Sequence, residues 1–340
     1  MNTPSLTLTL RLQRGTGRAV PEQVAAEIRG WIRDGRLATG QALPVLRSLA
    51  RSAGAHPSLI ARGLERLERE GWLERGEFGY RVADRLPLDS SPEALDRQIE
   101  SAREVQQRLL PDDLTSDELR IVSYFDSLHE VSGDLFDWFS DTSGRRWAIA
   151  VGDVAGKGLA AGMVMASVQT ALRMSAGRSD PASVLNDLNL ELVERTRARD
   201  FVALTLLHID LDRGRLRAAA AGAPDIFLRN ASGLSTVNIP GPHLPLGLRP
   251  AVAYESREIT LAPGDQLVVT TDGLPETPTG DGDLLGYTRF EERIDALTAQ
   301  HPCQRTKLHD FVSELDRELG GRPSDDRTLL WIQIAPPIAG

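Results

Sequence analysis

The stretch WAIAVGDVAGKGLAAGM, residues 147 to 163, decides the fold of the larger part of the chain. Its first five residues are apolar and predict a buried strand, after which Asp153 follows in a glycine-rich turn. Residues 159 to 176 then have the pattern of a helix. The turn differs from a phosphate-binding P-loop, because Val151 stands in place of the first glycine and Gly158 in place of the hydroxyl residue. The lysine of this turn therefore either helps to place a phosphate or is simply solvated.

Three other segments share this design, with an Asp at the end of an apolar run or in a turn: Ser132-Gly133-Asp134, Thr271-Asp272-Gly273 and Ser324-Asp325-Asp326-Arg327-Thr328. If the four segments meet in space, repulsion between their carboxylates forces some of them to hold protons unless a divalent cation neutralises them. Each also has a simpler explanation, since Asp134 could cap a helix and Asp272 before Gly273 is a common turn pair. A site for a hard metal ion is the first hypothesis.

Length and cysteine content limit the class of protein. With 340 residues the chain is long enough for two or three domains. Cys303 is its single cysteine, which excludes an internal disulfide and a thiolate zinc cluster and suits a reducing compartment. No apolar run approaches the roughly 18 to 20 residues that span a bilayer, and residues 1 to 18 lack the features of a signal peptide. We therefore expect a cytoplasmic protein with no membrane partner.

The net charge of -9 conceals two parts of opposite sign. Residues 1 to 85 carry 14 Arg, no Lys and 9 Asp or Glu, a balance of +5, which leaves -14 for the remaining residues. Opposite signs suggest different partners for the two parts. A balance of +5 permits contact with a phosphate backbone, but it is equally common on an ordinary solvated surface.

The first 85 residues predict three helices followed by a hairpin. Apolar residues recur at helical spacing over residues 21 to 34, and further helices are expected over residues 46 to 53 and 58 to 70. Two short segments, residues 72 to 75 and 80 to 82, are separated by a turn that begins and ends with glycine. This order predicts a helix-turn-helix with a wing.

This part resembles the winged helix-turn-helix domain of GntR-type regulators over nearly all of residues 6 to 84. The resemblance rests on IRDGRLATGQALP at residues 32 to 44, RSLA at 47 to 50 and LERLEREGWL at 64 to 73. In that family the third helix enters the major groove of DNA and the wing lies on the backbone. The resemblance implies that DNA contacts would come from Arg47, Ser58 and Arg62.

The chain departs from that family at the start of the third helix, where residues 56 to 59 read HPSL in place of the usual Ser-Arg and Thr. Two polar contacts are thereby lost, and Glu77 in the wing suits a phosphate poorly. Two interpretations stay open. The domain binds DNA, or the inherited fold serves as a dimerisation or partner-sensing module.

A linker joins this domain to the rest of the chain. Pro87 and the sequence SSP at residues 90 to 92 mark a break, and a helix is expected from there to Pro111. Gln106 interrupts a strict coiled-coil seam, so packing on the next domain and pairing of two copies are equally compatible with the pattern. The apolar stripe on this otherwise charged helix consists of Leu95, Ile99, Ala102, Val105 and Leu109.

Beyond the linker, strand-like and helical segments alternate. Strands are expected at residues 147–151, 201–207, 215–220, 226–228, 266–270 and 328–334. Helices are expected at residues 159–176, 181–197, 290–299 and 307–319. Strands mixed with pairs of helices indicate an α+β sandwich. The chain as a whole is then a multidomain α+β protein, with a winged-helix domain at residues 1–85, a linker helix at 86–111 and a third domain at 112–340.

Seven segments in order resemble the metal-dependent serine/threonine protein phosphatases, among them GDLFD at 133–137, TDGLPE at 271–276 and DDRTLL at 325–330. The most similar branch is the SpoIIE and RsbU type, and QQRLLP at 106–111 resembles the segment that precedes the domain in RsbU-like proteins. The resemblance covers roughly residues 98–334 and implies a protein phosphatase 2C-like α-β-β-α sandwich. Ser132 and Ala223 depart from the family pattern, but neither occupies a metal-ligand position.

The resemblance implies two Mn²⁺ or Mg²⁺ ions bridged by Asp153, with the carbonyl of Val154 on one of them. Asp272 and Asp325 would complete the protein ligands, and Asp134 would hold a water of the metal site. Two hard ions about 4 Å apart lower the pKa of a shared water and turn it into the nucleophile for phosphorus. Oxygen ligands favour manganese or magnesium over zinc.

The sequence therefore favours a metal-dependent phosphatase that removes phosphate from Ser or Thr of a protein and is regulated by the winged-helix domain. By the same resemblance, its substrate would be a phosphorylated anti-sigma-factor antagonist. The alternative is a GntR-like DNA-binding transcriptional regulator whose second domain is sensory or inactive. In a third interpretation, DNA or a small ligand tunes the phosphatase by moving the helix at 159–176. A homodimer formed through the linker helix or the winged-helix domain is compatible with each.

Overall fold

The structure is a computed structural model and describes Leu10, Leu12 and residues 19–76, 79–86, 92–175, 180–195 and 201–335. Glu77 of the wing and most of residues 6 to 18 lie outside the described residues. The chain divides into two units, Met1–Leu95 and Asp96–Gly340. None of the helices in the described ranges is long and apolar enough to cross a membrane.

The first unit holds the expected three helices and hairpin: α1 (Val20–Arg33), α2 (Leu46–Ala53), α3 (Pro57–Arg69), β1 (Leu73–Gly76) and β2 (Gly79–Val82). The apolar face of α1, including Trp31, is fully buried, and α1 packs on α3. The two helices lie so close that a Cβ atom on Gly63 would meet the Val24 side chain at 2.7 Å. The Nδ1 atom of His56 accepts a hydrogen bond from the Ser58 N–H at 3.3 Å, which caps the start of α3.

The linker helix α4 spans Pro92–Leu109. Its apolar stripe is only partly covered, since Val105 is 51% exposed. The polar residue that interrupts the stripe, Gln106, is instead buried at 6% exposure. Gln106 is therefore a buried polar residue at the position where the sequence pattern of a coiled coil is interrupted.

Two antiparallel sheets form the framework of the second unit. The six-stranded sheet has the order β10-β9-β12-β13-β4-β3, and the five-stranded sheet has the order β11-β8-β7-β6-β5. The strands of the first are β3 (Leu114–Thr115), β4 (Leu119–Asp126), β9 (Ile226–Asn230), β10 (Gly233–Val237), β12 (Gln266–Thr270) and β13 (Arg327–Ile334). Those of the second are β5 (Leu135–Ser140), β6 (Arg146–Val154), β7 (Val202–Asp210), β8 (Arg215–Ala221) and β11 (Arg257–Thr260).

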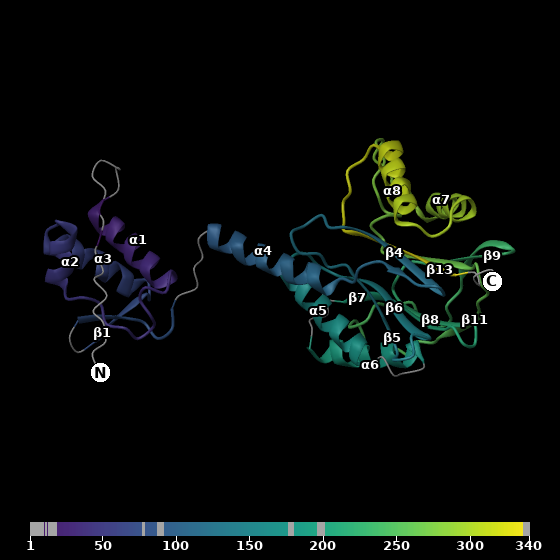
Figure 1. Cartoon of the computed structure of the whole chain (residues 1–340), viewed down its shortest axis with the longest axis horizontal. Coiled ribbons are helices and arrows are strands. Elements are labelled where there is room, and N and C mark those ends of the chain that lie inside the picture. The colour runs from purple at the N-terminus through teal and green to yellow at the C-terminus, as the bar shows by residue number, and fades with distance from the viewer. Residues whose placement is uncertain are drawn as a thin grey trace. The chain divides into compact units, whose positions relative to one another are not determined.

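Helices cover the outer face of each sheet (Figure 1). Helices α5 (Leu159–Met174) and α6 (Pro181–Arg195) pack on the five-stranded sheet, and α7 (Tyr287–Gln300) and α8 (Arg305–Leu319) pack on the six-stranded sheet. Apolar side chains from both sheets form one buried cluster, in which Ile149, Val151 and Leu330 are at most 2% exposed. The α-β-β-α sandwich implied by the resemblance is confirmed.

The structure corrects the expected set of strands. Strands β3, β4, β5, β10 and β11 were not predicted, although β4 and β5 lie in the two sheets that carry the core. In β5 the polar residue Asp137 interrupts the apolar run LFDWFS and hides it from a hydrophobic pattern. Asp137 is nevertheless fully buried, because Arg173 of α5 donates two hydrogen bonds of 2.6 Å to its carboxylate.

Candidate functional site

Asp153 lies near the end of β6, where the strand pairs with β7. The pairing is tight at the preceding glycine, because a Cβ atom on Gly152 would come within 2.6 Å of the Ala203 carbonyl oxygen. After Val154 the chain turns through two glycines with positive φ, Gly156 and Gly158, into α5. The predicted strand, glycine turn and helix are all present, and they hold the Asp153 carboxylate on rigid elements.

Asp134 precedes β5 and is 1% exposed. Its Oδ2 atom accepts hydrogen bonds from two hydroxyl groups, Thr271 Oγ1 at 2.9 Å and Thr328 Oγ1 at 2.6 Å. Segments more than 130 residues apart in the sequence therefore meet around one carboxyl group.

Mutual repulsion and burial raise the pKa values in this cluster. Burial and then the charges of Asp272 and Asp325 raise the pKa of Asp153 to about 7. Burial and then Asp153 raise the pKa of Asp134 well above its usual range, and burial followed by Glu276 and Asp325 raises the pKa of Asp272. The four acidic segments thus converge, and the raised pKa values of Asp134, Asp153 and Asp272 show that their charged forms are disfavoured without a cation.

The neighbours Asp325 and Asp326 have different roles. Asp326 is buried and accepts hydrogen bonds from the N–H groups of Leu128 and Gly133 and from the Ser132 hydroxyl. These three bonds occupy both of its oxygen atoms in holding the loop before β5. Asp325 is exposed, and its Oδ1 accepts a hydrogen bond of 3.0 Å from the Asp326 N–H. Asp325 is therefore the more available ligand of the two.

A close approach at Gly133 forms a small cradle of oxygen atoms. A Cβ atom at this position would lie 2.7 Å from the carbonyl oxygen of Val154 and 3.1 Å from Oδ1 of Asp153. The Val154 N–H also donates a hydrogen bond of 3.3 Å to the Gly133 carbonyl. Only glycine fits here, because a side chain would displace these two oxygen atoms. Both are atoms that a hard divalent ion prefers as ligands.

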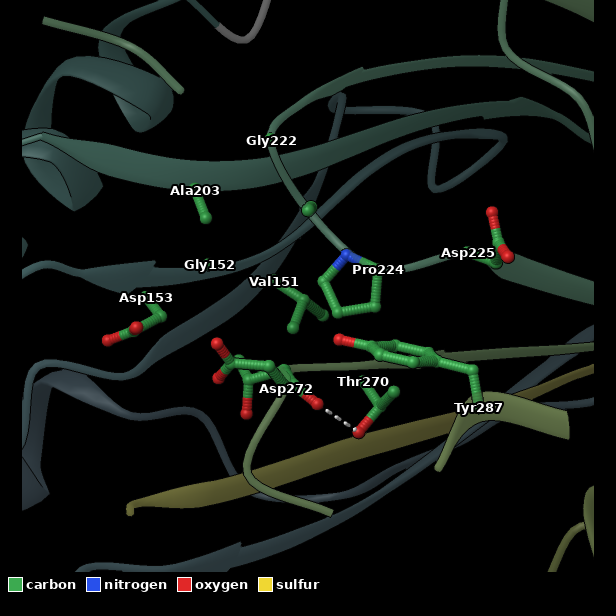
Figure 2. Close-up of a pocket in the computed structure, with 12 residues that line it drawn as sticks. Val151, Gly152, Asp153, Ala203, Gly222, Pro224, Asp225, Thr270, Asp272 and Tyr287 are labelled. Carbon is green, nitrogen blue, oxygen red and sulfur yellow. Dashed lines mark hydrogen bonds between the residues drawn. The ribbon is translucent and has the colours of Figure 1, made fainter. Parts of the chain in front are cut away.

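A cavity of about 340 Å³ extends from the acidic cluster. Figure 2 shows Asp153 and Asp272 at one end, Asp225 at the other, and the Tyr287 ring between them with its hydroxyl directed towards Asp272. The Tyr287 hydroxyl donates a hydrogen bond of 3.3 Å to Glu276. Burial, then the charges of Glu276 and Asp272, raise the pKa of Tyr287, so this hydroxyl stays protonated.

The carboxylates approach one another without forming a finished ligand sphere. Among the described residues, no group of three or more His, Cys, Asp or Glu side chains is placed to hold a metal ion. Asp134 is turned towards two threonines, and Asp325 towards the backbone. Lys157 is exposed and does not line the cavity. The donor set is nevertheless made entirely of oxygen atoms, which fits Mn²⁺ or Mg²⁺.

Sequence reasoning missed three features of this site. The loop-holding role of Asp326 has no signal beyond its position beside Asp325. Thr271 and Thr328 lie inside the quoted motifs, but their hydrogen bonds to Asp134 depend on the packing of β12 beside β13. Tyr287 lies at the start of α7, more than ten residues from any acidic motif, and only the structure brings it to the cavity.

The candidate DNA contacts lie together on the first unit. Arg47 near the start of α2 and both Ser58 and Arg62 of α3 are exposed. Arg47 and Arg62 form no ion pair with another residue in the described part of this unit, whereas Arg29, Arg66 and Arg75 do. Ser58 is partly occupied, because its hydroxyl lies 2.8 Å from His56 Nδ1.

Comparison with known proteins agrees with this architecture. The family model for stage II sporulation protein E (SpoIIE) matches residues 143–335, and that for bacterial regulatory proteins of the gntR family matches residues 21–77. The phosphoserine phosphatase RsbU of Bacillus subtilis is 26% identical over 230 residues, which is 66% of each protein. The phosphoserine phosphatase RsbP of the same organism is 25% identical over 183 residues, 52% of this chain and 45% of RsbP.

A solved structure shows the same fold. The SiaA-PP2C domain of Pseudomonas aeruginosa aligns with a TM-score of 0.62 and 21% identity, covering 73% of this chain and 100% of that domain. The present chain spans between about half and two thirds of the length of the two Bacillus relatives. Because the SpoIIE model covers more than half of the sequence, the chain belongs to the SpoIIE family and carries a gntR-type domain at residues 21–77.

Proposed function

We propose that this protein is a metal-dependent phosphatase for phosphoserine or phosphothreonine in a protein substrate. The observation that carries the proposal is the convergence of Asp134, Asp153, Asp272 and Asp325, whose mutual repulsion a pair of divalent cations would remove. Membership in the SpoIIE family and similarity to two phosphoserine phosphatases support the same activity. The cavity beside the cluster gives a phosphorylated side chain room to enter.

The residues have distinct parts in the proposed mechanism. Bound Mn²⁺ or Mg²⁺ ions would supply charge neutralisation and Lewis acidity at the phosphoryl group. Asp153, Asp272, Asp325 and the Val154 carbonyl would hold them, which requires Asp325 to turn away from the Asp326 N–H. Asp134 would orient the attacking water, since Thr271 and Thr328 fix one of its oxygen atoms and its carboxyl group, whose pKa burial raises, lies near enough to Asp153 for that charge to raise the pKa further. No covalent enzyme intermediate is needed.

The substrate and the domain organisation belong to the same proposal. We infer a phosphorylated anti-sigma-factor antagonist as the substrate, by analogy with RsbU-like proteins. A winged-helix domain at residues 1–85 and a linker at 86–111 would regulate a phosphatase domain at 112–340. A cytoplasmic location and a homodimer through the linker helix or the winged-helix domain stay predictions.

The deciding experiment is manganese-dependent dephosphorylation of a phosphoserine peptide with and without EDTA. Turnover with Mn²⁺ and its loss with EDTA are expected. Asp153→Ala and Asp272→Ala should each lower p-nitrophenyl phosphate hydrolysis by about a thousandfold or more. Asp212→Ala is the matched control, because this exposed carboxylate pairs with Arg145 in a turn and does not line the cavity. Retained turnover in either site variant would refute the assignment.

A second candidate function is DNA binding by the first unit. The gntR-family match and the exposed, unpaired side chains of Arg47 and Arg62 in the described part of this unit favour it. Binding of random duplex should appear in a gel shift at low salt and weaken steeply as salt rises. The double variant Arg47→Ala, Arg62→Ala should bind duplex more weakly than the wild type at the same salt concentration. If the wild type gives no gel shift at micromolar protein, DNA binding by this unit is refuted. Duplex added to the phosphatase assay tests whether the two functions are coupled.

A further inference from the structure

We propose that Gln106 of the linker helix α4 is a positioning residue for the metal site. It would act by fixing the backbone of the Ser132-Gly133-Asp134 loop and with it the cradle beside Asp153. This inference rests on the proposed phosphatase function.

Gln106 binds this loop through both ends of its side-chain amide. Its Nε2 donates a hydrogen bond of 2.8 Å to the Ser132 carbonyl, and its Oε1 accepts one of 2.9 Å from the Ser132 N–H. Gln106 is 6% exposed and Ser132 is fully buried. A primary amide that pairs with both backbone groups of one residue fixes the position and the direction of that peptide segment.

The contact is transmitted directly to the candidate metal ligands. The Ser132 hydroxyl accepts a hydrogen bond of 3.0 Å from the Asp134 N–H and donates one of 2.6 Å to Asp326. Gly133, between them, approaches the Val154 carbonyl and Asp153 so closely that a methyl group has no room. A shift of a few tenths of an ångström at Ser132 would therefore change both the Asp134 carboxyl and the oxygen cradle.

The helix that carries Gln106 is held at a second point. The Nε2 atom of Gln169, on α5, donates a hydrogen bond of 2.7 Å to the carbonyl of Leu109, one turn beyond Gln106. Gln169 is 2% exposed, and its side chain favours the charged form of Asp137, which partly offsets the rise that burial causes in the pKa of that carboxyl group. The C-terminal part of α4 is thus fixed to α5 and to the site loop together. The polar interruption of its apolar stripe is explained as a contact with the catalytic unit.

The exposed neighbour Gln107 offers a matched control. Gln106→Met keeps the length and approximate volume of the side chain but removes both hydrogen bonds, which leaves the Ser132 N–H and carbonyl without these partners. Gln107→Met makes the same chemical change on the exposed face of the same helix turn. Any difference between the two variants reports the contact with Ser132 and not the propensity of α4 for helix.

The full-length protein should be measured in three ways. Hydrogen exchange in EDTA should show the Ser132 amide exchanging about tenfold faster in Gln106→Met than in the wild type or Gln107→Met. Calorimetry should show Mn²⁺ binding weakened about tenfold in the same variant. In the phosphatase assay, the half-saturating Mn²⁺ concentration of Gln106→Met should rise by about the same factor. The KM for p-nitrophenyl phosphate should stay within about twofold of the wild-type value.

Unchanged exchange at Ser132, or faster exchange with unchanged Mn²⁺ binding, would overturn the proposal. If Gln106→Met fails to fold, Gln106→Glu replaces it, since it keeps the acceptor for the Ser132 N–H and loses the amide donor. The same criteria then apply. A wild-type protein without hydrolytic activity would refute the proposed function alone, because exchange and Mn²⁺ binding test the positioning role independently of turnover.

Discussion

The first unit and the candidate site of the second unit use their carboxylates in opposite ways. In the first unit, acidic side chains pair with arginines on the surface, as in Glu70 with Arg29 and Arg66, Glu68 with Arg75, and Glu74 with Arg81. At that site, burial and the charges of neighbouring carboxylates raise the pKa values of Asp134, Asp153 and Asp272, and no Lys or Arg among the described residues lines the adjacent cavity. The first arrangement is satisfied by the protein itself, whereas the second is satisfied only by protons or by cations from outside.

This difference shows why net charge was a poor guide to function in both units. The balance of +5 in the first 85 residues suggests a phosphate-binding surface, but ion pairs occupy much of it. The strongly negative remainder would suggest a unit that repels a phosphorylated substrate. Part of its negative charge instead lies at the candidate site, where bound metal ions would reverse its sign. The placement of each charge, and not the sum, separates the two units.

The largest effect is expected when the charge of Asp153 is removed. Asp153→Asn should lower manganese-dependent hydrolysis by about a thousandfold or more, because a proposed bridging ligand is lost. Without metal the same change should stabilise the fold. The pKa of Asp153 is raised from its ordinary 3.8 to about 7, so its contribution to stability is full below about pH 4 and is lost as the pH rises through 7.

Thermal melting of the full-length protein in EDTA measures this effect. The melting temperature of the wild type should fall between about pH 4 and pH 7, and Asp153→Asn should reduce that fall. Mn²⁺ at pH 8 should restore the melting temperature of the wild type but not of the variant. A melting temperature that is equally pH-dependent in both proteins would show that the carboxylates of the second unit do not destabilise one another.

Filling the cradle at Gly133 should have the next largest effect. In Gly133→Ala the new methyl group would meet the Val154 carbonyl and Asp153, which displaces two proposed ligand atoms without changing any charge. Hydrolysis should fall by about a hundredfold. Gly30→Ala is the control, because a Cβ atom on this helical residue has open space around it. Gly144→Ala would not serve, because Gly144 has positive φ and alanine would be strained there. Wild-type activity in Gly133→Ala would exclude the cradle as a ligand site.

The fold was predictable from local patterns to the extent that each strand carried an uninterrupted apolar run. The segment from Trp147 to Val151 and the acidic turn after it were found where expected. Strand β5 was missed because Asp137 breaks its pattern, and its partner Arg173 is 36 residues away. A buried ion pair between distant residues leaves no periodic signal in either segment.

The candidate site shows the same limit of sequence patterns. Asp134, Asp153, Asp272 and Asp325 lie in short motifs that the sequence displays directly. Gln106 and Tyr287 act through contacts with segments far away in the sequence, 26 residues in the case of Gln106 and Ser132. Such supporting residues depend on how the sheets and helices pack, which no single motif encodes.

Asp137 tests the contrast between paired and unpaired carboxylates within the second unit. It is as buried as Asp134, but Arg173 makes it a paired carboxylate of the kind found in the first unit. Arg173→Met would leave its charge buried without a cation, and the free energy of unfolding should fall by roughly 3 kcal/mol. Denaturation of the full-length protein, followed by hydrogen exchange in β5, measures the loss. Arg195→Met is the matched control, because its partner Glu191 is largely exposed.

The smallest effect is expected where a paired carboxylate is removed from the first unit. Glu70→Gln deletes the charge that faces Arg29 and Arg66, and these partly exposed pairs should contribute only about 0.5 kcal/mol each to stability. The change also raises the net charge of the unit and releases two guanidinium groups. If the ion pairs limit phosphate contact there, duplex binding at low salt should strengthen severalfold in Glu70→Gln but less in Glu27→Gln, whose carboxylate has no ion pair in the described part of α1. Equal binding by the two variants would mean that pairing does not distinguish the surface of the first unit, and that only the second unit uses the arrangement of its charges for function.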